Sequence, residues 1–480
     1  MFYFILLIFI FGYIVIALEH PFKIDKAATA LIIGVLTWTV YILSAENILN
    51  LGYSPSWSEF GNQVKNITDH IKPALSDSQW LDSGWASTIG AFNSPYLFVI
   101  EELEYHLIEI SEILFFLLGA MTIVEIIDQH EGFKVITDKI TTTNKVRLLW
   151  IIATITFFMS PVLDNLTTTI VMVALLKQLI DDKKTRWFFV SMVVLAANSG
   201  GAWSPIGDVT TIMLWIGGQI TALNIIVKVF LPSLVSIIVP LIIASFYMNG
   251  LVKRPVRINH GVSITSDKER IIVFVTGVGA LLFVPVFKTI THLPPYMGML
   301  FGLSVLWILT ERMHRSKPME VSDKLKVFNI LRKVDTPTVL FFLGILSAVS
   351  CLQSAGHLNI MAGFLSDHLG NVYLINTAIG LLSSIVDNVP LVAGAMGMYH
   401  IALPGSIGFD SFFVQDGRFW ELLAYCAGTG GSILIIGSAA GVAAMGIEKI
   451  DFIWYLKKIS WLAILGYFSG LATYFFMFGK

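Results

Sequence analysis

The sequence predicts an all-α polytopic membrane protein with about ten spanning helices, two re-entrant helical hairpins and broken helices at the midplane, arranged as an inverted-topology repeat. Three observations predict this fold class: a low charge content, repeated apolar runs, and interrupted segments that recur in the same order. Of the 480 residues, 55% are hydrophobic and 13% are charged, and the mean hydropathy is +0.76. Because soluble domains carry about 25% charged residues, this composition indicates a membrane protein.

The apolar runs supply the spanning helices, each of which needs roughly 20 apolar residues. The expected spans are 2–18, 27–44, 107–128, 187–220, 224–248, 271–290, 294–310, 336–355, 418–448 and 455–478. The first run has no basic residue before it and no small-residue cleavage site, so we expect a retained helix rather than a signal peptide. Two cysteines exclude a disulfide framework and a cysteine-based zinc site. The net charge of −2 gives no reason to expect a nucleic-acid partner.

The loop charges predict the orientation in the membrane. Lys and Arg concentrate in loops 19–26, 129–147, 249–270 and 311–335, as is typical of cytoplasmic loops. The stretch 45–106 is rich in Asp and Glu and is expected outside. Both termini are then extracytoplasmic, and we expect the chain in the inner (cytoplasmic) membrane of a bacterium.

Two apolar segments, 147–180 and 372–402, are interrupted near the middle. Basic residues flank both ends of segment 147–180, so both ends are expected on the cytoplasmic side. This favours a re-entrant hairpin with Asp164 at its tip over one long tilted helix or two full spans. The second hairpin, with Asp387 at its tip, is expected to enter from outside.

The interrupted elements form an internal repeat. The Asp-Asn tips at 164–165 and 387–388 differ by 387 − 164 = 223, and the runs 198–201 and 428–431 differ by 428 − 198 = 230. Each half makes an odd number of crossings, so the halves are inverted relative to each other, as in many secondary transporters. The expected regions are 1–106 (scaffold spans and the acidic segment), 107–248 (first transport elements), 249–335 (basic loops and scaffold spans) and 336–480 (second transport elements).

Irregular backbone at membrane depth survives only where it is buried in protein or lines a cavity, so the tips and the Gly-rich breaks 200–206 and 428–432 should meet at one polar site. A carboxylate at the bilayer centre costs ~2.5–3.5 kcal/mol and is functional by default. Helix capping is the alternative role for Asp164, Asp208 and Asp387. The predicted cation- and proton-binding residues are Asp164, Asn165, Thr168, Asn198, Ser199, Asp208, Thr210, Thr211, Asp387, Asn388, Thr429, Ser432 and Ser438.

Oxygen donors dominate this set, which favours a hard cation such as Na⁺ or Li⁺ over zinc or copper. A desolvated carboxylate can hold either a proton or a cation near neutral pH, which is the simplest basis for exchange. The second half has Ser438 where the first has Asp208, so we expect Na⁺ near Asp164 and Asp208. Glu125, Asp128 and His106 form a possible entry or pH-sensing site, although ordinary solvated helix ends explain them as well. No nucleophile–base set indicates an enzyme, and no cofactor is expected.

Three motifs carry a resemblance to a known family: the run Ser111–Asp128, the tip Asp164-Asn165-Leu166-Thr167-Thr168 and the break Asn198–Thr211. They resemble the NhaD sodium/proton antiporters of the ion transporter superfamily, whose relatives include arsenite and dicarboxylate carriers. The resemblance implies Na⁺ or Li⁺ expulsion driven by proton entry, and a homodimer with a scaffold domain and a transport domain in the lipid bilayer. The resemblance implies ion-binding roles for Asp164, Asn198, Asp208, Thr210, Thr211, Asp387 and the Ser and Thr residues of the second break. The stretch 50–104 does not fit the family pattern.

Two other transport functions stay open. A Na⁺-coupled carrier of a small anion, of the dicarboxylate or arsenite type, would hold the anion at helix N-termini. Carboxylates at both tips disfavour an anion. A channel can also contain paired hairpins, but three carboxylates within a closed inverted-repeat site are not typical of one.

Overall fold

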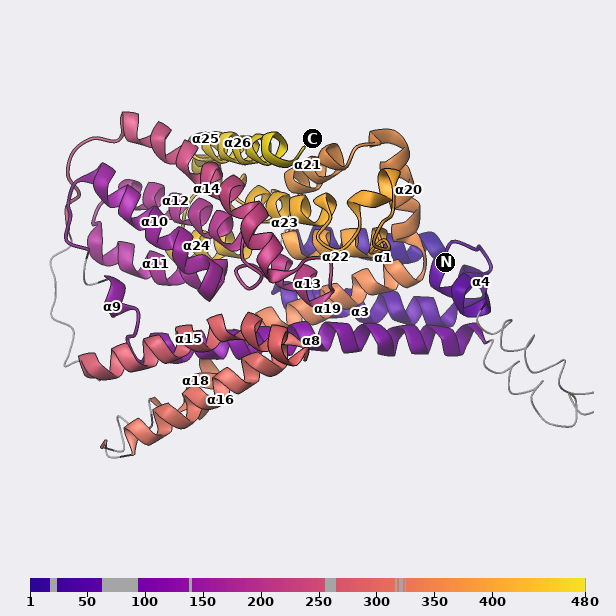
Figure 1. Cartoon of the computed structure of the whole chain (residues 1–480), viewed down its shortest axis with the longest axis horizontal. Coiled ribbons are helices and arrows are strands. Elements are labelled where there is room, and N and C mark those ends of the chain that lie inside the picture. Colours follow the sequence, from indigo (N-terminus) through magenta and orange to yellow (C-terminus); the bar gives the residue numbers. More distant parts are fainter. Residues whose placement is uncertain are drawn as a thin grey trace, which may run out of the picture. The chain divides into compact units, whose positions relative to one another are not determined.

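The computed structural model describes residues 1–17, 24–62, 94–137, 140–254, 265–315, 317–318, 323 and 325–479. Within these ranges the chain is helical and contains no β-strand, which confirms the predicted all-α class (Figure 1). Seven helices in the described ranges are long and apolar enough to cross a membrane, and several shorter apolar helices accompany them. The number of crossings stays a prediction.

The first of two compact units comprises Met1–Leu114, Pro337–Gly370 and Ala393–His400. Its helices are α1 (Phe2–Ala17), α3 (Lys26–Leu43), α4 (Ala45–Leu49), the first part of α8 (Pro95–Gln129), most of α19 (Thr336–Ser354) and α20 (His357–Leu369). Helices α3 and α19 approach closely through glycines, since a Cβ on Gly344 would lie 2.4 Å from the carbonyl carbon of Ala30. Trp38 Nε1 donates to the Ser347 carbonyl oxygen at 2.8 Å across the same contact. Small residues at such crossings are typical of membrane helices.

The expected start of the span 107–128 was wrong. Residues Ala45–Leu49 form α4, and α8 begins at Pro95, well before the expected span at 107. The acidic residues Glu101, Glu102 and Glu104 lie within α8, since Glu is a good helix former and prolongs the helix beyond the apolar run. Residues 63–93 of the acidic segment lie outside the described part of the chain.

The second unit comprises Phe115–Thr336, Asn371–Val392 and Ile401–Lys480. Its first helices are α9 (Lys134–Thr137), α10 (Lys145–Leu163), α11 (Asn165–Leu179), α12 (Lys183–Ala202), α13 (Val209–Ile216), α14 (Ala222–Tyr247), α15 (Asp267–Thr291), α16 (Pro295–His314), α18 (Val327–Ile330) and η2 (Leu331–Lys333). They are followed by α21 (Val372–Leu382), the first part of α22 (Asn388–Met398), η3 (Gly408–Phe412), α23 (Arg418–Gly430), α24 (Ala439–Glu448), α25 (Phe452–Lys458) and α26 (Ser460–Phe478). In this unit α10 packs on α12, α21 packs on α23, and α14 packs on α26.

Both predicted hairpins are broken where the sequence indicated. Asp164 separates α10 from α11 with φ 71° and ψ 163°, a backbone conformation that is almost restricted to glycine, so the chain is strained at this tip. Residues 383–387 separate α21 from α22. The expected spans 187–220 and 418–448 are also each split into two helices.

The predicted position of the glycines within those splits was wrong. Gly200 and Gly201 lie in the last turn of α12, and Gly428 and Gly430 lie in α23. These glycines allow close packing. A Cβ on Gly200 would lie 2.4 Å from the Phe157 carbonyl oxygen, so no larger residue fits. The irregular segments come later, at 203–208 and 431–438.

The same packing contacts recur in both halves of the second unit. Ser160 donates to the Ala197 carbonyl oxygen at 2.6 Å, and Ser383 donates to the Ala427 carbonyl oxygen at 2.8 Å. The paired residues differ by 383 − 160 = 223 and 427 − 197 = 230, the two offsets found in the sequence. The inverted orientation of the halves and the domain boundaries at 106, 248 and 335 stay predictions.

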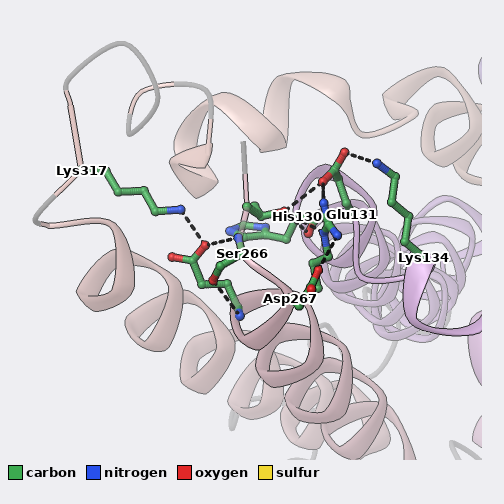
Figure 2. A network of polar contacts seen from close by, with 9 residues as sticks. His130, Glu131, Lys134, Ser266, Asp267 and Lys317 are labelled. Atoms are coloured by element: carbon green, nitrogen blue, oxygen red, sulfur yellow. Dashed lines mark hydrogen bonds and ion pairs between the residues drawn. The ribbon is translucent and has the colours of Figure 1, made fainter. Parts of the chain in front are cut away.

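A polar network joins three segments of the second unit at the C-terminal end of α8 (Figure 2). Glu131 forms ion pairs with Lys134 and with Arg270 near the start of α15. Lys317, just after α16, pairs with Glu269 at 2.8 Å. All these segments belong to loops with the basic composition of the cytoplasmic side.

Candidate functional site

Asp208 and Ser438 occupy equivalent positions at the ends of the two irregular segments. Asp208 has φ −146° and ψ 147° and caps α13, and Ser438 has φ −144° and ψ 153° and caps α24. The Asp208 carboxylate accepts from the Thr210 N–H at 3.1 Å, and the Ser438 hydroxyl accepts from the Gly441 N–H at 3.2 Å. The repeat therefore presents a carboxylate in one half and a hydroxyl in the other on the same backbone geometry.

The Asp208 carboxylate receives hydrogen bonds from both hairpins. Asn165 at the first tip donates from Nδ2 to Oδ2 of Asp208 at 2.8 Å, and Asn388 at the second tip donates to the same oxygen at 3.2 Å. Asp208, Asn165 and Asn388 are only 2%, 4% and 3% exposed. Hydrogen bonds to an ionised acceptor are roughly twice as strong as neutral ones, so these amides favour the charged carboxylate.

Asn198 connects this group to the second broken helix. Its Oδ1 accepts from Asn165 Nδ2 at 3.0 Å, while its own Nδ2 donates to the hydroxyls of Ser432 at 2.8 Å and Ser438 at 2.9 Å. A continuous chain of side chains therefore runs from Asp208 through two amides to the irregular segment of the second half. We call Asp208, Asn165, Asn388, Asn198 and Ser438 the Asp208 cluster.

Asp164 and Asp387 act as helix caps. Asp164 accepts from the Thr167 N–H at 2.7 Å and from the Thr167 hydroxyl at 2.8 Å. Asp387 accepts from the Val389 N–H at 3.2 Å. In the described part of the chain, no group of three His, Cys, Asp or Glu side chains is placed to hold one metal ion. Both tip carboxylates therefore cap a helix, and binding of Na⁺ or H⁺ by Asp164 and Asp387 stays a prediction.

The hydroxyl residues of the predicted set divide into two groups. Ser199 accepts from Ser236, Thr429 donates to the Tyr425 carbonyl oxygen, and Thr211 donates to the Asp208 carbonyl oxygen, so these hydroxyls are occupied. Thr168 and Thr210 are fully buried, and their hydroxyls have no hydrogen-bond partner among the described residues. Such orphan oxygens are rare and need an explanation, of which an absent ion or water is one.

The possible entry or pH-sensing residues make local contacts within α8. Glu125 accepts from Gln129 at 2.8 Å. His106 lies 3.2 Å from Glu109 and 3.8 Å from Glu102. The roles expected for Glu125, Asp128 and His106 stay predictions.

Several residues that shape this region were not identified from the sequence. Ser160 and Ser383 hold each hairpin to its broken helix, and their recurrence at the offset of 223 was a signal that could have found them. Glu448 at the end of α24 is buried and pairs with Arg186 near the start of α12 at 2.7 Å. That pair joins residues 262 apart in sequence, and no local pattern predicts it.

Comparison with known proteins places the chain in a family. A sequence model of the citrate transporter family (CitMHS) matches residues 6–412. The chain is 52% identical over 378 residues to sodium/proton antiporter 1 of Arabidopsis thaliana, covering 78% of this chain but only 63% of that protein. It is 48% identical over 384 residues to sodium/proton antiporter 2 of the same plant, covering 78% and 87% of the two chains. It is 31% identical over 396 residues to the Na⁺/H⁺ antiporter NhaD of Vibrio cholerae, covering 76% and 78%.

Family match and relatives agree with the helical membrane architecture described above. The chain belongs to the CitMHS family of the ion transporter superfamily, with relatives named as sodium/proton antiporters, and is a multi-pass membrane transporter rather than an enzyme.

Proposed function

We propose that the chain exchanges Na⁺ or Li⁺ for H⁺, with the two ions competing for the Asp208 carboxylate. The observation that supports this most strongly is the environment of Asp208. It is 2% exposed, and among the described residues no Lys, Arg or His forms an ion pair with it. Several relatives are named as sodium/proton antiporters, which agrees with the proposal.

The physical argument concerns the cost of a buried charge. An isolated carboxylate in a low-dielectric site is strongly destabilised unless a cation or a proton neutralises it. The Asn165 and Asn388 amides lower that cost but carry no net charge. Asp208 therefore has two favourable states, protonated and cation-bound, and one ion must leave before the other binds.

The proposed cation ligands are oxygen atoms of Asp208 and of the helices α11 and α13, which begin at the first hairpin tip and at Asp208. The carboxylate itself supplies the charge, and the orphan hydroxyls of Thr168 and Thr210 are the further ligands that we propose. Hard cations prefer such oxygen donors. Asn165 and Asn388 position the carboxylate from the two hairpin tips, so a movement of either hairpin changes the site.

The orientation in the membrane is proposed from the charges of the loops, and the oligomeric state from the resemblance to the NhaD antiporters. Loop charge supports both termini outside and the basic loops on the cytoplasmic side of a bacterial inner membrane. The resemblance to the NhaD antiporters supports a homodimer. Crosslinking of the full chain in membranes tests the dimer. Labelling of the variant Arg315→Cys with a membrane-impermeant thiol reagent tests which side of the membrane the loop faces. The native Cys351 and Cys426 are buried, so the wild type serves as the unlabelled control.

A second function receives support from the description of the family, which is that of citrate transporters. In this alternative the chain carries a small anion together with Na⁺. The Asp208 cluster argues against it, because a buried carboxylate held by amides repels an anion and no cationic side chain among the described residues pairs with it.

The decisive assay uses everted membrane vesicles with an imposed pH gradient and a pH-sensitive dye. Addition of Na⁺ at pH 8 is expected to restore the dye fluorescence in vesicles with the wild-type chain. Vesicles with Asp208→Asn, which has the same size and no charge, are the matched control.

Absence of a Na⁺-dependent response at pH 8 in the wild type would reject the exchange function. Proteoliposomes with labelled citrate address the alternative. Uptake of citrate that depends on a Na⁺ gradient would replace the proposal by the anion carrier.

A further inference from the structure

A cavity of about 1050 Å³ lies beside the C-terminal end of α16. Arg312, Arg315 and Lys326 line it together with Glu311, His314 and Ile308. Three cations against one carboxylate make this cavity basic. It lies within the second unit and contains none of the residues of the Asp208 cluster, so ion transport does not account for it.

Two of the cations are available to a ligand. Arg312 and Arg315 are exposed, and neither has an ion pair with another described residue. Lys326, by contrast, pairs with Asp323 at 2.6 Å, and the Glu311 carboxylate accepts from Trp307 Nε1 at 2.7 Å. Guanidinium groups bind phosphate oxygens in a bidentate geometry, so two of them together favour a phosphate ligand.

His314 adds an unsatisfied atom to the cavity wall. His130 Nδ1 lies 2.6 Å from the Ile126 carbonyl oxygen, which can only accept, so that nitrogen carries a proton. Burial lowers the pKa of His130, so its ring is neutral at pH 7 and its Nε2 accepts from His314 Nε2 at 2.7 Å. His314 is 3% exposed, and its Nδ1 is then an acceptor without a partner among the described residues. A hydroxyl group on a ligand would satisfy it.

The outward face of α16 changes from apolar to cationic along its length. Phe301, Val305 and Ile308 are 54%, 43% and 68% exposed. Arg312 and Arg315 continue the same spacing of four and three residues, which keeps all five side chains on one face of the helix. We call these five residues the α16 stripe. An apolar surface that ends in two cations is complementary to an acyl chain that ends in an anionic phosphate.

The location also suits a lipid. Helices α15 and α16 pack together and separate toward the ends that carry Asp267 and His314 (Figure 1). The basic loop 311–335 is expected on the cytoplasmic side, where the membrane surface is negative and attracts Lys and Arg by about 1 kcal/mol each.

We propose that this cavity binds the headgroup of an anionic phospholipid from the cytoplasmic leaflet, with Arg312 and Arg315 on the phosphate and an acyl chain along Phe301, Val305 and Ile308. Phosphatidylglycerol fits the wall best, because its headgroup hydroxyls can donate to His314 Nδ1. A soluble phosphate shares the headgroup chemistry, but it would leave the apolar part of the α16 stripe unused. The proposal does not depend on which ion the chain carries.

The test measures lipid binding to the purified full chain by native mass spectrometry in detergent. Phosphatidylglycerol, phosphatidylcholine and glycerol phosphate are titrated separately into the wild type and into the double variant Arg312→Gln with Arg315→Gln. Loss of two guanidinium groups that contact the phosphate is expected to weaken phosphatidylglycerol binding about a hundredfold. The matched control is Lys268→Gln with Arg332→Gln, which removes two exposed cations of the same expected side from outside the cavity. It removes no contact with the phosphate and should change the affinity less than about threefold.

Equal affinity of the wild type and the Arg312/Arg315 variant for phosphatidylglycerol would overturn the proposal. An equal loss of affinity in the Lys268/Arg332 control variant would also overturn it. Binding of glycerol phosphate as tight as that of phosphatidylglycerol would replace the lipid by a soluble phosphate. Val305→Asn, on the part of the α16 stripe outside the cavity, gives an independent arm if the double variant fails to fold. It is expected to weaken phosphatidylglycerol binding while leaving any glycerol phosphate binding unchanged, and no effect on the lipid would contradict the role of the α16 stripe.

Discussion

The two broken helices of the second unit have the same backbone arrangement and different chemistry. In both, a serine of the hairpin donates to a carbonyl of the broken helix, glycines allow the close approach, and an N-cap residue begins the helix that follows. That N-cap residue is Asp208 in the first half and Ser438 in the second. Both side chains cap a helix, but only Asp208 carries a charge that needs a counterion or a proton.

The comparison separates what the fold requires from what the ion requires. Capping needs an oxygen that accepts an N–H, and Ser and Asp both provide one. A buried carboxylate is not needed for capping and is expensive without a partner. The excess charge in the first half is therefore the feature best explained by transport, and the second half serves as an internal control.

The largest difference between the halves is expected from removal of each cap side chain. Asp208→Asn keeps an N-cap residue and removes the charge, so Na⁺-dependent exchange in everted vesicles should fall to the level of vesicles without the protein. Ser438→Ala loses a cap worth about 1 kcal/mol and one partner of Asn198, so exchange should persist at a reduced rate. Full activity of Asp208→Asn, or loss of activity only in Ser438→Ala, would contradict the assignment.

The hairpin tips offer the second comparison. Asn is a good N-cap, so Asp164→Asn and Asp387→Asn remove charge without removing the cap. We expect Asp164→Asn to abolish exchange and Asp387→Asn to reduce it less, because the second half carries less acid. Membrane insertion, checked by expression level, should be unchanged in both. If both variants reduced exchange only slightly, Asp164 and Asp387 would have no role beyond capping their helices.

The amides of the tips should differ by a smaller amount. Asn165 donates to Asp208 at 2.8 Å and also joins Asn198, whereas Asn388 donates at 3.2 and 3.4 Å. A hydrogen bond to a charged group contributes about 1.5–3 kcal/mol, so Asn165→Ala should raise the Na⁺ concentration for half-maximal exchange by about tenfold or more. Asn388→Ala should raise it less. The reverse order would show that the second hairpin is the closer partner of the ion.

The smallest difference between the halves is expected in packing. Gly200→Ala and Gly430→Ala each place a Cβ within 2.4 Å of a carbonyl oxygen, of Phe157 and Gly380 respectively. Overpacking of this kind costs typically about 1–3 kcal/mol, so both variants should unfold at similarly lowered temperatures. Gly446→Ala, whose Cβ would meet nothing within 4 Å, is the matched control and should not lower the unfolding temperature. A lowering in only one half would break the packing equivalence.

Sequence reasoning predicted the features that local spacing records. The breaks at Asp164 and before Asn388 follow from polar and Pro residues inside apolar runs, and the match of Asp208 with Ser438 follows from a constant offset. The start of α8 and the true place of the irregular segments were missed, because helix boundaries depend on packing as well as on composition. The pairs His130–His314 and Arg186–Glu448 join residues 184 and 262 positions apart, so no local sequence pattern predicts them.

Competition of Na⁺ and H⁺ at Asp208 is tested most directly by proton release from the purified protein. Addition of Na⁺ to the wild type in weakly buffered detergent near neutral pH should release about one proton per chain, since cation binding displaces a proton from its ligand. Asp208→Asn should release none, while Ser438→Ala should still release protons. Equal Na⁺-induced proton release from the wild type and from Asp208→Asn would contradict the account.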